Sequence, residues 1–175
     1  MEKKHSIALI GFMGTGKTVV GKNLANKLNK DYKFIETDEI IEEMAGKSIP
    51  EIFREDGENR FRELEIAACK KVSQLKNVIV SCGGGVVLNK INIDYIKQDF
   101  HIVLLIATPE EILKRIMKEG EKKRPLLDRP DPMKEIKALL KFRSSFYGAH
   151  AVFTVDTTGK SIDEIVSEII IKIGI

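Results

Sequence analysis

The segment Gly11–Thr18 is the part of the sequence whose residue types and spacing most clearly indicate chemistry. It matches the phosphate-loop pattern G-x-x-x-x-G-K-[ST] at every fixed position. Glycines let backbone N–H groups curl around a phosphate chain, and a helix after the loop would direct its positive end toward the same anion. Lys17 would reach the β- and γ-phosphates, and the Thr18 hydroxyl would bind Mg²⁺. The predicted nucleotide-binding residues are Gly11, Met13, Gly14, Thr15, Gly16, Lys17 and Thr18.

Alternating strand and helix patterns surround this loop. Short apolar runs predict strands at 6–10, 33–36, 78–81, 100–106 and 151–155. Helical periodicity and helix-start residues predict helices at 17–29, 38–45, 49–55, 58–75, 109–118, 132–147 and 161–173. This order predicts an α/β fold of the P-loop NTPase type, a three-layer sandwich with a five-stranded parallel sheet and helices on both faces. Ligands would bind where the strands end.

The length and composition predict one domain over residues 1–175. Residues 119–132 are polar, charged and rich in proline, so we expect a mobile lid there. The two cysteines form no metal-binding pattern, and no apolar run could span a membrane. The net charge of +3 comes from lysines interleaved with glutamates, which does not indicate nucleic-acid binding. A monomeric cytoplasmic protein is predicted.

A phosphate loop alone does not separate kinases from nucleotide switches. A GTPase switch also needs DxxG followed by NKxD, and here the DxxG match at 156–159 lies near the C-terminus with no NKxD after it. This order favours a small ATP-dependent kinase with a lid over its site. A nucleotide-binding protein without chemistry stays open as an alternative.

Several further motifs make the chain resemble the shikimate kinases over essentially its whole length. They are the phosphate loop, Phe34–Asp38, Gly46–Phe53, Gly57–Glu65, Gly83–Gly85, Arg124–Leu127 and Arg143–Tyr147. The resemblance implies transfer of the γ-phosphoryl group of ATP to the 3-hydroxyl of shikimate, with Mg²⁺, in the route to aromatic amino acids. It also implies that a segment of about 33–65 binds the substrate. Kinases for gluconate or a nucleoside monophosphate are the nearest alternatives.

The resemblance implies roles for single residues. Asp38 would hydrogen-bond the substrate and accept the proton of the attacking hydroxyl, although it could equally cap the helix that follows. Arg62 and Arg143 would bind the shikimate carboxylate with two parallel hydrogen bonds each. For Arg62 the alternative is a surface ion pair with Glu65, which in the family reading orients the arginine cluster.

The remaining implied residues surround these groups. Gly83, Gly84 and Gly85 would let backbone N–H groups approach the substrate. Phe53 and Phe61 would form apolar walls, with ordinary core packing as the alternative. These walls and the glycine turn would enclose the substrate ring.

Two arginines would complete the nucleotide side of the site. Arg124 in the lid would act on the transferring phosphoryl group, and it is the third predicted catalytic residue with Lys17 and Asp38. Arg115 would stack on adenine, although a solvent-facing position on its helix fits the sequence almost as well.

The sequence departs from the family pattern at Glu36, where aspartate is common. We expect Glu36 to join Thr18 in binding Mg²⁺, with the extra methylene changing how closely it approaches the ion.

Overall fold

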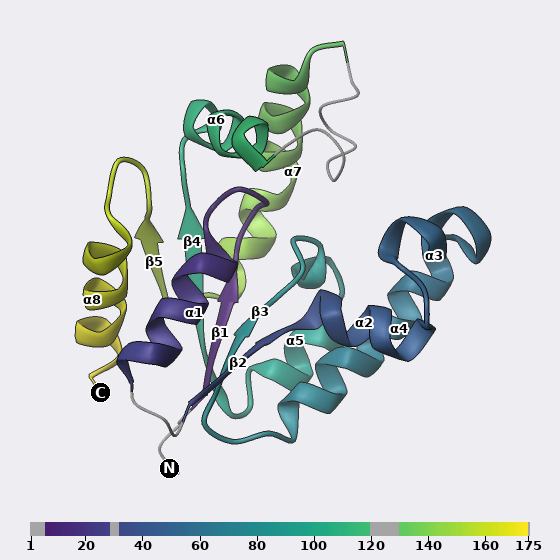
Figure 1. Cartoon of the computed structure of the whole chain (residues 1–175), viewed down its shortest axis with the longest axis horizontal. Coiled ribbons are helices and arrows are strands. Elements are labelled where there is room, and N and C mark those ends of the chain that lie inside the picture. The colour runs from purple at the N-terminus through teal and green to yellow at the C-terminus, as the bar shows by residue number, and fades with distance from the viewer. Residues whose placement is uncertain (1–5, 29–31, 120–129, 175) are drawn as a thin grey trace.

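The computed structural model describes residues 6–28, 32–119 and 130–174. Its centre is a five-stranded sheet in the order β2-β3-β1-β4-β5, and every neighbouring pair is parallel (Figure 1). The strands are β1 Ser6–Ile10, β2 Lys33–Glu36, β3 Val78–Ser81, β4 Phe100–Ile106 and β5 Phe153–Asp156. All five residues of β1 are buried, which explains why its sequence is almost wholly apolar. The predicted α/β sheet is confirmed.

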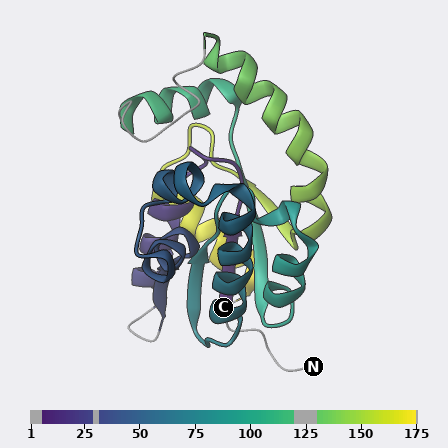
Figure 2. The same cartoon turned by 90° about the vertical axis from the view of Figure 1, so that its right-hand side faces the viewer.

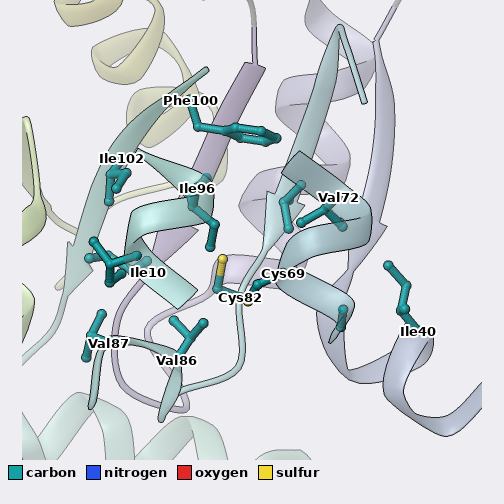
Figure 3. Close-up of a cluster of buried hydrophobic side chains, with 14 of the residues drawn as sticks. Ile10, Ile40, Cys69, Val72, Cys82, Val86, Val87, Ile96, Phe100 and Ile102 are labelled. Atoms are coloured by element: carbon teal, nitrogen blue, oxygen red, sulfur yellow. The ribbon is translucent and has the colours of Figure 1, made fainter. Parts of the chain in front are cut away.

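Helices cover both faces of the sheet (Figure 1). Helices α1 Lys17–Lys27 and α8 Ile162–Ile173 pack on one face around Leu9, Leu24 and Ile169. The other face is covered by α4 Gly57–Ser73 and α5 Lys90–Ile96, with α2 Thr37–Ala45 and α3 Ile49–Glu55 beside α4. The core on this side includes the two cysteines, Cys69 and Cys82 (Figure 3).

A third apolar cluster lies above the carboxyl end of the sheet. There α6 Pro109–Glu119 and α7 Pro132–His150 pack against each other, and Figure 2 shows both helices rising beyond the strands. Phe12 of the phosphate loop is buried between Ile112, Ile116 and Ile136. This packing fixes the phosphate loop to the two helices that flank the predicted lid.

Capping residues decide where several helices begin. Ser48 and Ser161 each form a capping box with a glutamate three residues later, at the starts of α3 and α8. The Asp131 side chain accepts a hydrogen bond from the N–H of Lys134 at the start of α7. Gly46 ends α2 in the left-handed conformation.

The structure differs from the prediction between residues 86 and 96, where no element was expected. A short 3₁₀ helix, η1 Val86–Leu88, is followed there by α5, which Asn89 caps through its side chain. The stretch is too short for helical periodicity to stand out, so the Asn89 cap was the usable signal. Elsewhere the elements are as predicted, with shifts of a few residues at their ends.

Two other predictions can be compared with the described residues only in part. Most of the predicted lid, with Arg124, lies outside them. Among the described helices, none combines the length and the apolar character that crossing a membrane requires.

Candidate active site

The phosphate loop joins β1 to α1, and its glycines have conformations that other residues rarely adopt. Gly11, Gly14 and Gly16 have φ angles of 143°, 74° and 93°. A Cβ atom on Gly11 would lie 2.3 Å from the carbonyl oxygen of Leu105 in β4. The pattern of glycines therefore follows from the path of the backbone as well as from the need to expose N–H groups.

Lys17 folds back over this loop. Its ammonium donates hydrogen bonds to the carbonyl oxygens of Gly11 and Phe12, at 2.9 and 3.0 Å. These contacts hold one positive charge inside the curve of the loop, where a phosphate chain would add acceptors of its own.

The two residues predicted to bind a metal come together. The Thr18 hydroxyl, at the start of α1, donates a hydrogen bond to the carboxylate of Glu36 at the end of β2. Both are hard oxygen donors of the kind that Mg²⁺ prefers, so they fit this ion. The described residues include no cluster of three or more His, Cys, Asp or Glu side chains that could hold a metal. Mg²⁺ bound here would need oxygens from the nucleotide and water as well.

Asp38 lies in the first turn of α2, opposite the phosphate loop. The helix begins at Thr37, so Glu36 and not Asp38 occupies the N-cap position, without a capping hydrogen bond from its side chain, and the alternative of Asp38 as the capping residue is wrong. Desolvation by the surrounding protein raises the pKa of Asp38, and the positive charge of Lys17 opposes this shift while Glu36 adds to it. A carboxylate with a raised pKa accepts a proton more readily than an ordinary aspartate.

The glycine turn after β3 packs closely against Asp38. A Cβ atom on Gly83 would lie 2.7 Å from Asp38 Oδ1. The Gly83 N–H donates to the buried Thr37 hydroxyl at 2.9 Å, and this bond ties the turn to the start of α2. Gly83 thus leaves room for the Asp38 carboxylate.

One cavity of about 320 Å³ joins these groups. Its walls are the phosphate loop and the start of α1, together with Glu36, Asp38, Ser81–Gly85 and Arg143. The cavity lies at the carboxyl ends of β1, β2 and β3, where the fold predicts ligand binding.

Arg143 reaches the cavity from α7. Its guanidinium lies 5.7 Å from the centre of the Phe12 ring, and Nη1 donates to the Gly84 carbonyl at 3.4 Å. Tyr147, one turn along the same helix, donates to the same carbonyl at 2.6 Å. The buried Arg143 Nε has no hydrogen-bond partner within the described residues, so this arginine keeps unused donor capacity beside the cavity.

Arg62 of α4 lies next to the glycine turn, and Glu65 and Glu58 of the same helix pair with it. Arg62 Nη1 lies 2.9 Å from the place where a Cβ of Gly85 would be, and it donates to both carboxylate oxygens of Glu65, at 3.2 and 3.3 Å. It also pairs with Glu58 on the exposed side of α4. The pairing with Glu65 is present, but Glu65 is buried, so the alternative of a surface ion pair is wrong in that respect. Arg62 and Glu65 do not line the cavity themselves.

Phe61 lies against the Arg62 guanidinium, Phe53 packs on Phe61, and neither ring lines the cavity. Phe61 belongs to the core and Phe53 is 42% exposed, and their ring centres are 4.7 Å apart. Core packing therefore describes Phe61, as the alternative had it. A role for either ring at the substrate stays a prediction.

Arg115 contacts the outer side of the phosphate loop. It donates to the Gly14 carbonyl at 3.1 Å and to the hydroxyl and carbonyl of Thr157, at 2.9 and 2.8 Å. A solvent-facing position for Arg115 is therefore wrong. A second cavity of about 390 Å³ lies here, between Arg115 and Ile162.

The sequence did not indicate three residues that link segments of the site through hydrogen bonds: Thr37, Tyr147 and Thr157. Thr157 is fully buried, and its hydroxyl donates toward the carbonyls of Thr15 and Ile106. Each of the two threonines directly follows a strand that ends in an acidic residue, Glu36 or Asp156, and a single sequence does not reveal that the threonine hydroxyl is buried there.

The sheet order, the phosphate loop after β1 and the acidic end of β2 define the class of the protein as a P-loop kinase. The family model for shikimate kinase matches residues 13–174. A shikimate kinase from Caldanaerobacter subterraneus subsp. tengcongensis is 49% identical over 94% of each chain. The chain belongs to the shikimate kinase family.

Solved structures agree with this assignment. The shikimate kinase from Acinetobacter baumannii in complex with shikimate superposes with a TM-score of 0.89 at 32% identity, covering 98% of this chain and 94% of the other. The shikimate kinase from Aquifex aeolicus has a TM-score of 0.81 at 37% identity, covering 97% and 96%.

Proposed function

We propose that the chain transfers the γ-phosphoryl group of ATP to the 3-hydroxyl of shikimate, giving ADP and shikimate 3-phosphate in the route to aromatic amino acids. Membership of the shikimate kinase family supports the substrate. The observation that carries the proposal is the single cavity lined by the phosphate loop, Asp38 and Arg143. It offers a phosphate site, a proton acceptor and a carboxylate-binding cation side by side.

The transfer makes one bond and breaks another. The 3-hydroxyl oxygen forms a bond to the γ-phosphorus, the bond from that phosphorus to the bridging oxygen of ADP breaks, and the hydroxyl proton passes to Asp38. Lys17 and the backbone N–H groups of Gly14–Thr18 hold the phosphates in line with the hydroxyl. The raised pKa of Asp38 suits it to take up this proton.

Thr18 and Glu36 are the residues that would hold Mg²⁺, and their hydrogen bond supports this role. When bound, the ion neutralises charge on the β- and γ-phosphates. Glu36 is the last residue of β2, and only β3 lies between this strand and β1, so the Glu36 carboxylate reaches Thr18 at the start of α1.

The acid group of shikimate would be held by Arg143 and Arg62, with Glu65 orienting Arg62 and Gly83–Gly85 closing the same side. Segment 33–65 would form much of this half of the site. Arg115 would face the adenine. Arg124, in a lid of about 119–132, would contact the transferring phosphoryl group, as the family resemblance implies.

An acceptor survey tests the function. Release of ADP from Mg-ATP would be followed with shikimate, gluconate and nucleoside monophosphates, and the phosphorylated product identified by ³¹P NMR. We expect release that depends on shikimate alone. Release that depends only on gluconate, or no release that depends on an acceptor, would refute the proposal.

A monomeric state, a cytoplasmic location and the absence of nucleic-acid partners stay predictions from composition. The first can be tested by sedimentation of the free enzyme.

A further inference from the structure

The buried side-chain amide of Asn92 connects Glu65, the partner of Arg62, with the backbone that follows the glycine turn. Asn92 lies in α5 and has no exposed surface. Its Nδ2 group donates to Glu65 Oε2 at 2.9 Å and to the carbonyl oxygen of Val86 at 3.2 Å. Val86 follows the glycine turn directly, and its own N–H is bonded to the Gly83 carbonyl at 3.1 Å. One amide group thus contacts both the partner of Arg62 and the backbone that continues the turn.

The orientation of this amide is fixed by its surroundings. Both groups that face Nδ2 are acceptors, so turning the amide over would set its oxygen against a carboxylate and a carbonyl. In the present orientation the buried Oδ1 has no partner within the described residues. An unpaired buried acceptor destabilises the fold, and an apolar residue of similar size would avoid that cost. Packing alone therefore does not explain asparagine at this position.

The donor has an electrostatic effect on Glu65. Desolvation raises the pKa of Glu65, and the charge of Arg62 and the hydrogen bond from Asn92 work against this rise. Asp38 from α2 also acts on Glu65 and raises its pKa, and the Glu65 charge in turn raises the pKa values of the thiols Cys69 and Cys82. These thiols stay neutral because burial raises their own pKa values. Asn92 is thus the only uncharged donor to the Glu65 carboxylate within the described residues.

We propose that Asn92 is a positioning residue for the substrate acid group, because its amide holds the Glu65 carboxylate in the orientation in which Glu65 pairs with Arg62 beside the glycine turn. The inference rests on the proposed function and names a residue that acts through two others. Without the donor, Glu65 takes up a proton at higher pH, its ion pair with Arg62 is lost, and Arg62 leaves the position that faces Gly85. Binding of shikimate weakens, while the phosphate loop is unaffected.

The test compares two variants with a control on the same helix. Asn92→Leu removes both donors at similar volume, and Asn92→Asp keeps the shape but adds a second carboxyl group beside Glu65. The control is Ile96→Val, which trims a fully buried neighbour in α5. We expect the KM for shikimate to rise about tenfold or more in both Asn92 variants, with the KM for ATP within twofold of the parent. In Asn92→Leu the rise grows as pH falls, because protonation of Glu65 removes its ion pair with Arg62. Ile96→Val leaves both constants and the pH profile unchanged.

A second readout does not depend on activity. The ¹³C shift of the Glu65 carboxyl group, followed against pH by NMR, gives its pKa in each protein, and we expect a higher value in both Asn92 variants than in the parent. Asn92→Asp decides the matter if Asn92→Leu does not fold. An unchanged pKa of Glu65, an unchanged KM for shikimate, or an equal rise of both KM values would overturn the inference.

The two proposals fail in different ways. If the parent phosphorylates shikimate and the Asn92 variants match it, the function stands and the positioning role is wrong. If the parent does not use shikimate, the proposed function is wrong, and the Glu65 titration still decides whether Asn92 controls this carboxylate.

Discussion

Asp38 shows how the surroundings of one residue prepare it for proton transfer. Desolvation by the surrounding protein raises the pKa of Asp38 although its side chain is open to the cavity, and the positive charge of Lys17 lowers that pKa. Gly83 leaves the space that the carboxylate occupies, and Thr37 anchors that glycine. The pKa and the position of this carboxylate therefore depend on residues that follow β1 and β3 as well as on its own segment after β2.

Replacing Asp38 by asparagine removes the proton acceptor and keeps the shape. We expect kcat to fall by about 10²–10⁴-fold, the range for loss of a general base, with ATP affinity within a few-fold of the parent. Steady-state rates and calorimetric titration with ATP check this. The control is Glu39→Gln, an exposed carboxylate on the same helix. Near-normal turnover in Asp38→Asn would remove Asp38 from the mechanism.

Replacing Arg143 by lysine keeps the charge but removes the planar pair of donors. We expect the KM for shikimate to rise at least tenfold, and more than the KM for ATP, because an ammonium cannot make two parallel bonds to a carboxylate. Arg60→Lys is the matched control, since Arg60 pairs with Glu63 on the exposed surface of α4. Equal changes in both KM values would argue against contact with the acid group.

At the scale of elements, the site is made where strands end and turns begin. The ends of β1, β2 and β3 supply the phosphate loop, Glu36 with Asp38, and the glycine turn. Since these strands are neighbours in a parallel sheet, residues far apart in the sequence reach the same cavity. The glycines at these ends make the close approach of the backbones possible.

Gly11→Ala tests this close approach. The added Cβ would meet the Leu105 carbonyl at 2.3 Å, at a φ of 143°. We expect a loss of roughly 2–3 kcal/mol of unfolding free energy and weaker ATP binding. Gly148→Ala is the control, because it lies in α7 with nothing within 4 Å of its added Cβ, and it should stabilise the fold by up to about 1 kcal/mol. Denaturant titrations of both variants measure the difference, and equal stabilities would contradict the packing seen at Gly11.

The elements that the sequence predicted are those with strong local signals. Apolar runs marked the strands, and helical periodicity with Gly46 and Pro50 as boundary residues marked the helices. Helix α5 was missed although α3 has the same length, because α3 carries a proline in its first turn and α5 does not. The same limit applies to the site. Glycines, Lys17 and Asp38 stand in motifs, but the contacts of Asn92 and Thr157 arise only when distant segments pack together.

At the scale of the whole molecule, two apolar cores lie on opposite faces of the sheet, and both cysteines are buried in one of them (Figure 3). Burial raises the pKa of Cys82 to about 12 and that of Cys69 further still. Both thiols therefore stay protonated in the folded chain at pH values where exposed thiols ionise.

This difference makes stability depend on pH. Above about pH 8.5 the unfolded chain loses thiol protons that the folded chain keeps, so the folded state binds more protons and the free energy of unfolding falls as pH rises. We expect a fall of roughly 1 kcal/mol per thiol between pH 8 and 9.5. Urea titrations of the parent and of a Cys69→Ala, Cys82→Ala variant measure it. The variant should lose that part of the slope, and identical slopes would show that the thiols do not contribute.

The central claim is that one cavity holds the phosphate chain of ATP and the acid substrate on either side of Asp38. A crystal structure of the chain with ADP and shikimate tests it most directly. We predict that the diphosphate lies on the N–H groups of Gly14–Thr18, with the 3-hydroxyl of shikimate facing Asp38 and its carboxylate against Arg143. A diphosphate bound elsewhere, or shikimate with its carboxylate turned away from Arg143, would contradict the account.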